Sequence, residues 1–280
     1  MTDTFTRPTR TTLPNLEQGS DEWHDQRRGI VTASVVGNLI TIGKLTAIDY
    51  DCPNCGAAKE APCVGKRPPH APLKTLHTER AAVARDAGSS SIVLETASND
   101  VSRGLTMLLV AERITGWTEE MHISEDMFRG ILDEPRARDK YSECYTPVTQ
   151  AGFMTYEEPG IKLGFSPDGL VGDEGLIEIK SRRPKKHVAT ILSGHPPAEN
   201  MAQCQAGLLV SGRQWLDYIS YCGGLPMWKT RVFPDHRWFD AILNATRTFE
   251  ANAAEMVRLY SEGVHGFPMT ERIVEQEMVI

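Results

Sequence analysis

Residues 164–180 read Gly164-Phe-Ser-Pro-Asp168-Gly-Leu-Val-Gly172-Asp-Glu-Gly175-Leu-Ile-Glu178-Ile-Lys180. The pattern predicts a short strand, a glycine-containing turn and a second strand that runs back beside the first. Side chains alternate along a strand, so Glu178 and Lys180 share one face while the isoleucines beside them face the other way. The turn between Gly172 and Gly175 allows Asp168 to return beside Glu178.

These three polar residues form a combination that can carry out chemistry. Two carboxylates placed close together repel each other unless a divalent cation lies between them, and oxygen-only ligation suits Mg²⁺. Lys180 can then polarise a scissile phosphate, or orient and deprotonate a metal-activated water. An isolated Glu-x-Lys pair on a strand is more often a solvated ion pair. The interpretation as a site therefore depends on a longer pattern.

That longer pattern, Pro167-Asp168-x9-Glu178-x-Lys180, resembles the PD-(D/E)xK nucleases. Three further segments are similar to motifs of phage lambda exonuclease and the related YqaJ-type viral recombination nucleases. They are W-H-D-Q-R-R-G-I-V-T-A-S over 23–34, G-I-L-D-E-P-R-A-R-D-K-Y over 130–141 and M-A-Q-C-Q over 201–205. The segments occur in the family's order and cover most of the chain outside residues 44–88.

The fold expected from this resemblance agrees with the periodicity of the chain. Amphipathic helical patterns around 98–115, 197–210 and 237–261 enclose a strand-rich centre, which predicts an α/β domain. The resemblance implies a restriction-endonuclease-like core, with a central mixed β-sheet flanked by helices and a small zinc-binding insertion. It also implies a metal-dependent 5′-to-3′ double-stranded DNA exonuclease that generates 3′ single-stranded overhangs in phage-type homologous recombination.

The resemblance also implies roles for individual residues. Asp168 and Glu178 would hold the catalytic Mg²⁺ or Mn²⁺, together with the backbone carbonyl of Ile179. The remaining catalytic residues implied by the family motifs are Glu134 at the metal site, Lys180 at the nucleophile or phosphate, and Gln203, which orients groups at the site.

Arg27 and Ser34 would bind the 5′ phosphate of the DNA end, again by resemblance. The residues themselves support this assignment. Thr32 to Ser34 are predicted to open a helix, whose exposed N–H groups and positive dipole favour an anion. Arg27 offers a bidentate partner for the same anion.

A cysteine cluster lies within residues 44–88. Cys52-Pro-Asn-Cys55-Gly is a tight pair, followed by Cys63. With one histidine, the three cysteines would complete a tetrahedral, structural zinc site. The alternative is a set of free thiols in a loop. The segment also resembles small zinc-binding modules that carry C-P-x-C-G, a later P-C and H-x-x-R.

Two histidines can supply the fourth zinc ligand, His70 or His77. His77 is preferred because residues 73–87 have helical composition and a helix holds a donor rigidly. His70 lies in the Pro-rich stretch 67–72, which is less well fixed.

Composition places the chain among soluble globular proteins, with 280 residues, 40% hydrophobic and 24% charged. Its formal net charge is −7, although the basic block over 178–187 is either a solvated face or one wall of a positive groove. No apolar run is long enough to span a membrane, and residues 1–14 lack a signal-peptide pattern, so a cytoplasmic location is expected. Residues 1–14 are predicted to be a flexible tail, and residues 15–280 a nuclease domain interrupted by the insert at 44–88.

The resemblance implies duplex DNA ends as substrate, a single-strand annealing protein as partner and a ring-shaped homotrimer. Two alternatives stay open. One is an endonuclease on the same fold, and the other is a non-catalytic, zinc-containing adaptor for DNA or protein. The presence of Asp168, Glu178 and Lys180 argues against the adaptor.

Overall fold

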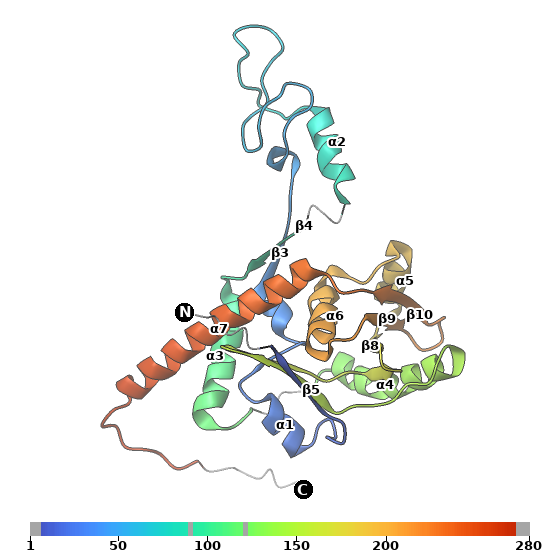
Figure 1. Cartoon of the computed structure of the whole chain (residues 1–280), viewed down its shortest axis with the longest axis vertical. Coiled ribbons are helices and arrows are strands. Elements are labelled where there is room, and N and C mark those ends of the chain that lie inside the picture. Colours follow the sequence, from blue (N-terminus) through green and yellow to red (C-terminus); the bar gives the residue numbers. More distant parts are fainter. Residues whose placement is uncertain (1–6, 89–91, 120–122, 273–280) are drawn as a thin grey trace.

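The structure is a computed structural model that describes residues 7–88, 92–119 and 123–272. Two four-stranded sheets form its body, with strand orders β1-β5-β6-β2 and β10-β9-β8-β7 (Figure 1). The first sheet contains β1 (Thr9–Leu13), β5 (Phe153–Glu158), β6 (Ile161–Phe165) and β2 (Val31–Thr32). The second contains β10 (Trp228–Val232), β9 (Trp215–Tyr221), β8 (Gly175–Ser181) and β7 (Gly169–Val171).

Both sheets are mixed. The pairs β2–β6 and β8–β9 are parallel, and the other neighbours within these two sheets are antiparallel. The prediction of an α/β fold with mixed strands and flanking helices is confirmed, although the strands form two sheets where one central sheet was expected.

Helices cover the sheets and enclose the main core. α6 (Ala198–Ser211) contacts β5, β6 and β9, while α7 (His236–Gly263) contacts α6, β6 and α3 (Asp100–Thr115). α4 (Glu125–Cys144) packs on β8. The two remaining helices of the body are α1 (Asp21–Arg27) and α5 (Pro184–Ser193).

Strand β8 separates two hydrophobic clusters. Its Ile177 and Ile179 pack with Ala137 and Tyr141 of α4. The alternate residue Leu176 belongs to the larger core, which also contains buried residues of α6 and α7. The predicted alternation along β8 is therefore confirmed, and Glu178 and Lys180 lie on the opposite face from the two isoleucines.

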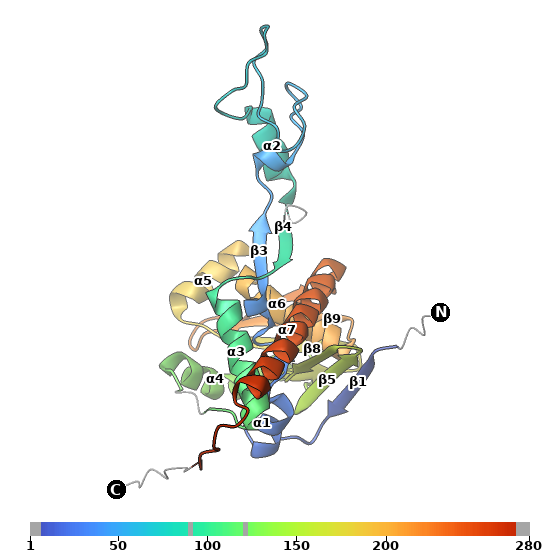
Figure 2. The ribbon, with the colours of Figure 1, turned by 90° about the vertical axis from the view of Figure 1, so that its left-hand side faces the viewer.

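A separate lobe projects from the body on a two-stranded ribbon (Figures 1 and 2). The ribbon pairs β3 (Ile40–Lys44) with β4 (Ile92–Thr96) in antiparallel register. Between them the described part of the lobe contains the short 3₁₀ turn η2 (Ala47–Asp49) and helix α2 (Thr78–Asp86). We call residues 45–88, which follow β3, the zinc lobe; they lie within the range 44–88 that was predicted to be an insert.

The prediction of a flexible tail is wrong for Thr9–Leu13, which form β1 along the edge of β5. The three threonines of this strand favour extended backbone. Arg10 anchors it, because its guanidinium donates two hydrogen bonds of 3.2 Å to the Leu209 carbonyl and lies over the Tyr156 ring. Residues 1–6 of the predicted tail lie outside the described residues.

The helix predicted to open at Thr32 is also absent from the structure. Val31–Thr32 form β2, and a single 3₁₀ turn, η1 (Val36–Leu39), follows. The Ala33 N–H donates to the Gly164 carbonyl at 2.8 Å, which extends the parallel pairing with β6. Because this N–H is used within the sheet, it is not a free helix N-terminal donor for an anion.

No helix in the described ranges combines the length and the apolar character that crossing a membrane requires.

Candidate active site and zinc cluster

Asp168 lies directly before β7, at the end of the link from β6. The β7–β8 hairpin pairs Gly169 with Ile177, which returns the chain as the sequence predicted. The Ile179 N–H donates to Asp168 Oδ2 at 2.6 Å. This bond fixes one carboxylate beside the strand that carries Glu178.

Glu178 and Lys180 form an ion pair on that strand. Lys180 Nζ lies 2.7 Å from Glu178 Oε1 and donates to Gln203 Oε1 at 2.9 Å. Gln203 comes from α6, so the site joins a strand of the second sheet to a helix of the main core. The Glu178 side chain is 1% exposed, and the Lys180 side chain is 24% exposed.

Glu134 approaches the same region from α4. Arg138, one helical turn further on, pairs with Glu134 and donates to the Asp168 carbonyl at 2.7 Å. The Tyr141 hydroxyl donates to Asp217 Oδ2 of β9 at 2.8 Å and fastens the helix to the sheet. The structure therefore brings Glu134, Asp168, Glu178, Lys180 and Gln203 together around one end of β8.

The electrostatics show that the carboxylates are unfavourable neighbours. Burial raises the pKa of Asp168 well above its usual value, and the charges of Glu178 and Glu134 raise it further. Burial also raises the pKa of Glu134, and Glu178 adds to this effect while Arg138 opposes it. For Lys180, burial alone would lower the pKa, but the charges of Glu178 and Asp168 raise it. The ammonium thus compensates only part of the negative charge.

These residues fit a divalent cation. Both Glu178 oxygens are buried without a hydrogen bond of good geometry, although Lys180 lies close to Oε1. Buried carboxylate oxygens with unused lone pairs are suitable ligands for a hard cation. Within the described ranges the three acids form a looser group than the four zinc-type ligands, whose donor atoms all lie within 4.8 Å of one another.

The side chains of Arg27 and Ser34, the two residues predicted to bind a 5′ phosphate, contact each other beside this site. Arg27 Nη2 donates to Ser34 Oγ at 3.4 Å, and its Nη1 donates to Ser166 Oγ at 3.2 Å. Trp23 Nε1 also donates to Ser166 Oγ at 2.9 Å, and Arg27 stacks 4.1 Å above the Trp23 ring. Burial lowers the pKa of Arg27 to about 10, so it stays charged at neutral pH.

Ser166 is a site residue that the sequence analysis did not identify. It lies two residues before Asp168, and its hydroxyl accepts from both Trp23 and Arg27. A hydroxyl has two acceptor positions and one proton, so the proton stays available for a further group. The signal in the sequence was its position inside the phrase Ser-Pro-Asp.

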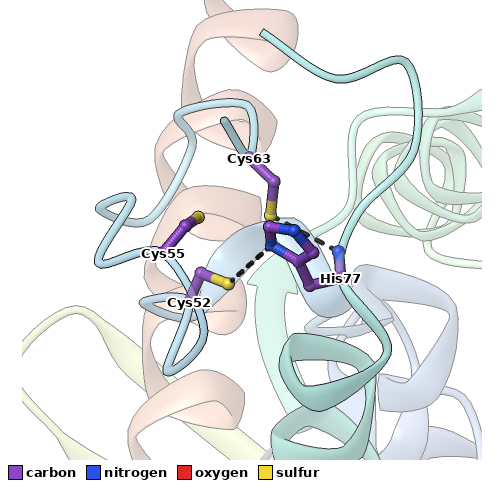
Figure 3. Close-up of side chains that lie close together, drawn as sticks. All are labelled: Cys52, Cys55, Cys63 and His77. Carbon is purple, nitrogen blue, oxygen red and sulfur yellow. Dashed lines mark hydrogen bonds between the residues drawn. The ribbon is translucent and has the colours of Figure 1, made fainter. Parts of the chain in front are cut away.

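The zinc lobe gathers Cys52, Cys55, Cys63 and His77 (Figure 3). Cys52 Sγ lies 3.4 Å from His77 Nδ1, and the His77 N–H donates to Cys63 Sγ at 3.4 Å. Ligands at about 2.0–2.3 Å from a tetrahedral zinc lie about 3.8 Å or less from each other. The cluster and its ligand types therefore support zinc, with His77 as the fourth ligand.

The two histidines have different environments. His77 is the residue that precedes α2, whose Arg80 and Ala81 N–H groups donate to its carbonyl. The helix thus fixes the backbone of His77. This residue was expected inside the helix, but it lies directly before it. His70 lies outside the cluster, where its Nδ1 is 2.9 Å from the Gly65 carbonyl.

Arg80 forms the interior of the zinc lobe. It is fully buried and donates to the carbonyls of Tyr50, Ala61, Ile48 and Ala58 at 2.7–3.0 Å. Its Nη1 also lies 3.6 Å from Cys63 Sγ. Backbone N–H groups of Val64 and Ala57 lower the pKa of Cys55 to about 6, which favours the thiolate that a metal requires.

Comparisons with known families match two overlapping parts of the chain. Residues 80–214 match the YqaJ-like viral recombinase domain, and this range contains Glu134, Asp168, Glu178, Lys180 and Gln203. Residues 7–91 match the family described as "Putative DNA-binding phage zinc finger domain", and this range contains the four zinc-type ligands. A search of curated proteins found no match.

Comparison with solved structures also indicates a nuclease. The chain is similar to an alkaline exonuclease from Laribacter hongkongensis, with 26% identity and a TM-score of 0.62 over 88% of this chain and 98% of that one. It is also similar to that enzyme in complex with dAMP, with 27% identity and a TM-score of 0.60 over the same shares of the two chains. These likenesses support a nuclease, and the match over residues 7–91 supports a zinc-binding segment in the same chain.

The zinc cluster predicts a metal content that can be measured directly. Purified wild-type protein should contain about one zinc per chain, because four ligands surround a single centre. Cys55→Ser should reduce this to near zero, and His70→Ala should keep it. Elemental analysis of the gel-filtered proteins gives the ratios. Loss of zinc from His70→Ala, or none in the wild type, would contradict the assignment.

Because the buried carboxylates repel one another, we expect them to destabilise the folded protein when no metal is bound. A carboxyl with a raised folded-state pKa binds its proton more tightly when folded, so folding is favoured less as pH rises above about 4. Asp168→Asn should therefore raise the unfolding temperature at neutral pH by about 2–4 °C, the shift that about 1 kcal/mol gives.

Thermal unfolding in magnesium-free buffer measures this difference, with exposed Asp173→Asn as the matched control. The gain should shrink as the pH falls to about 4 and below, where the Asp168 carboxyl becomes protonated in the unfolded chain as well as in the folded protein. A variant less stable than wild type at every pH would show that Asp168 contributes to folding and is not under electrostatic strain.

Proposed function

We propose that the chain is a divalent-metal-dependent deoxyribonuclease that digests duplex DNA from a 5′-phosphorylated end. It releases nucleotides in the 5′-to-3′ direction and leaves a 3′ single strand for recombination. The observation that carries the proposal is the contact set of Asp168, Glu178 and Lys180 around one end of β8. Similarity to an alkaline exonuclease that has been crystallised with dAMP supports it.

The metal would be held by Asp168 and Glu178, with the Ile179 carbonyl as a further ligand and Glu134 assisting. A bound Mg²⁺ or Mn²⁺ supplies Lewis-acid stabilisation of negative charge on the phosphate and lowers the pKa of water. The buried oxygens of Glu178, which accept no hydrogen bond of good geometry, support this ligand set. Arg138 would keep Glu134 in position, because it joins that carboxylate to the Asp168 backbone.

Lys180 would act on the phosphodiester. Its ion pair with Glu178 keeps it protonated, which supports a role as a charged donor to a phosphate oxygen. Gln203 accepts from the ammonium and would hold it in line with the metal site. Removing a donor of this kind costs about 10²–10³ in rate.

A 5′-phosphate subsite gives the enzyme its direction. Arg27 and Ser34 would bind the terminal phosphate. Ser166, whose hydroxyl accepts from Arg27, would donate its proton to the same phosphate. Ser166 and Asp168 are two residues apart, so their Cα atoms are separated by at most about 7 Å. This span leaves room for one nucleotide step between the terminal phosphate and the metal site.

The zinc lobe would contact DNA away from the active site. No acidic residue occurs from Ala61 to Thr78, whereas Lys66, Arg67 and Lys74 are exposed there. The segment from Val64 to Lys74 loops back on itself through a Gly65 N–H bond to Ala71 and a Val64–Pro72 bridge. The family described for residues 7–91 is named for DNA binding, which supports the same role.

The proposal extends to the domain organisation, the assembly, the location and the protein partner. Residues 15–280 would act as one nuclease domain interrupted by the zinc lobe. The protein would assemble as a ring-shaped trimer in the bacterial cytoplasm and pass its 3′ strand to a single-strand annealing protein. In the basic block, Arg183 and Lys186 form ion pairs with Asp126 and Glu199, so these charges belong mainly to a solvated face.

The proposed activity is tested with linear duplexes that carry separate labels on the 5′ and 3′ ends. With Mg²⁺, the 5′ label should be released first as a mononucleotide while the 3′ label stays in a long strand. Closed circular plasmid should stay intact. Prompt nicking of the circle would favour the endonuclease, and DNA binding without cleavage in Mg²⁺ or Mn²⁺ would favour the adaptor.

Lys180→Gln should lower the cleavage rate by about 10²–10³-fold, because it removes the charged donor. Its amide can still bond to Gln203, and binding of duplex DNA should change little. Single-turnover digestion and filter binding measure the two quantities. Wild-type turnover in this variant would remove Lys180 from the mechanism.

Arg27→Ala should reduce the preference for 5′-phosphate over 5′-hydroxyl ends by about tenfold or more, the value of a charge-assisted hydrogen bond. Competition between the two substrates measures the ratio. Arg247→Ala, which removes an exposed guanidinium paired with Glu158, is the control. A ratio that survives in Arg27→Ala would mean that the phosphate is bound elsewhere.

We expect the exposed basic residues of the segment from Val64 to Lys74 to contribute to the salt dependence of DNA binding. Lys66→Ala/Arg67→Ala should lower the slope of log affinity against log salt by about 2, because about 0.9 counterions are released per phosphate contact. The double variant Lys59→Ala/Arg85→Ala removes the same charge from other exposed positions of the lobe and is the control. Equal salt slopes for the two double variants would exclude a specific DNA contact by Lys66 and Arg67.

A further inference from the structure

Gly29 lies in the turn that joins α1 to β2, two residues after Arg27. The Ile30 N–H closes this turn by donating to the Arg27 carbonyl at 3.3 Å. Gly29 is buried and has a φ of +67°, a left-handed conformation that glycine adopts without strain. The conformation of this turn therefore sets the position of the last turn of α1, and with it Arg27, relative to β2.

Two consecutive side chains of α3 hold both backbone groups of Gly29. Glu112 Oε2 accepts from the Gly29 N–H at 2.7 Å, and Arg113 Nε donates to the Gly29 carbonyl at 2.6 Å. Glu112 is 7% exposed, so its hydrogen bond is largely shielded from water. A Cβ at Gly29 would lie 2.5 Å from Arg113 Cγ, which shows how closely α3 approaches the turn. We call these two hydrogen bonds the Gly29 clamp.

The Gly29 clamp is anchored in the main core. The Arg113 guanidinium donates two hydrogen bonds, of 2.7 and 2.8 Å, to the Glu250 carboxylate of α7. It also lies over the ring of Phe249, a buried residue of the main core. Bidentate pairs of this kind fix the orientation of a guanidinium. Helices α3 and α7 together therefore support the turn that follows Arg27.

Helix α1 has few other attachments to the body. None of its seven residues is buried. Within the described ranges, its side chains form hydrogen bonds to other elements through Trp23 and Arg27, and their partners are Ser166 and Ser34. Arg27, Ser34 and Ser166 are the groups proposed to engage the terminal phosphate. The Gly29 clamp is thus a support of α1 that phosphate binding would leave in place.

We infer that Glu112 is a positioning residue of the 5′-phosphate subsite, which holds Arg27 in place through its hydrogen bond to Gly29. The inference rests on the proposed function and adds to it a residue that contacts neither the phosphate nor the metal. Small displacements of a binding group can lower a rate by a large factor, so such a support affects function. Arg113 shares the clamp but also joins two core helices, so Glu112 gives the cleaner test.

The first test compares three substitutions of Glu112. Glu112→Leu removes the acceptor and should lower the preference for 5′-phosphate over 5′-hydroxyl ends about three- to tenfold, the range that loss of one hydrogen bond gives. Glu112→Asp is a milder variant whose carboxylate is one methylene shorter, and it should lower the preference about twofold or more. Glu112→Gln keeps an acceptor and should keep most of the preference.

Competition between the two duplexes in one reaction measures this preference as a ratio of rates. A smaller folded fraction slows both reactions equally and leaves the ratio unchanged, so the ratio distinguishes positioning from general stability. Thr106→Val is the matched control, because Thr106 is also buried on α3 but its hydroxyl donates to the Ser102 carbonyl of the same helix. This variant should keep the wild-type ratio.

A double-mutant cycle tests whether Glu112 acts through Arg27. In the Arg27→Ala background, Glu112→Leu should change the ratio by less than about twofold, because the group that Glu112 positions is already absent. An equal loss with and without the Arg27 side chain would contradict the inference, because Glu112 would then act on another group.

The outcomes separate the inference from the proposed function. If wild type prefers phosphorylated ends and Glu112→Leu and Glu112→Asp keep that preference, Glu112 does not position Arg27, although the phosphate subsite stands. The same conclusion follows if Glu112→Gln or Thr106→Val loses as much as Glu112→Leu. If wild type cleaves both kinds of end equally well, the phosphate subsite itself fails, and the role of Glu112 fails with it.

Discussion

The candidate active site depends on one constraint, the burial of Glu178 on β8. Its carboxylate is buried, and among the described residues the cation paired with it is the Lys180 ammonium at 2.7 Å. Burying an ionised carboxylate is costly unless partners compensate it, and one amine shared with Asp168 and Gln203 compensates it only in part. A divalent cation held between the carboxylates, as we propose, would resolve this conflict. The neighbouring helices keep Glu178 buried, because α4 covers one face of β8 and α6 covers the other.

Most of this arrangement could be predicted from the sequence, because it is local. Alternation along a strand sets Glu178 and Lys180 on one face whatever surrounds them, and a hairpin closed by glycines returns Asp168 to the strand. The zinc cluster was equally local, since its ligands fall within one short segment. Glu134 and Gln203 came from the family resemblance alone, because only tertiary packing brings their helices to β8.

The missed features all depend on long-range contacts. β1 forms because a distant strand, β5, offers an edge, and Val31–Thr32 stay extended because β6 pairs with them. Ser166 takes its contacts from Trp23 and Arg27, which lie far away in sequence. Arg80 replaces a hydrophobic core in the zinc lobe by binding four carbonyls, which no charge or periodicity pattern reveals. The metal and this arginine together compensate for the small apolar surface that the lobe can bury.

The most direct measurement is anomalous diffraction from crystals of the protein soaked with Mn²⁺. A manganese peak should appear within about 2.0–2.6 Å of one oxygen each of Asp168 and Glu178, with Lys180 nearby. The zinc peak should stay separate, at the cysteine–histidine cluster of the lobe. Crystals that bind Mn²⁺ elsewhere and leave the space between Asp168 and Glu178 without a metal would contradict a metal-dependent site on β8.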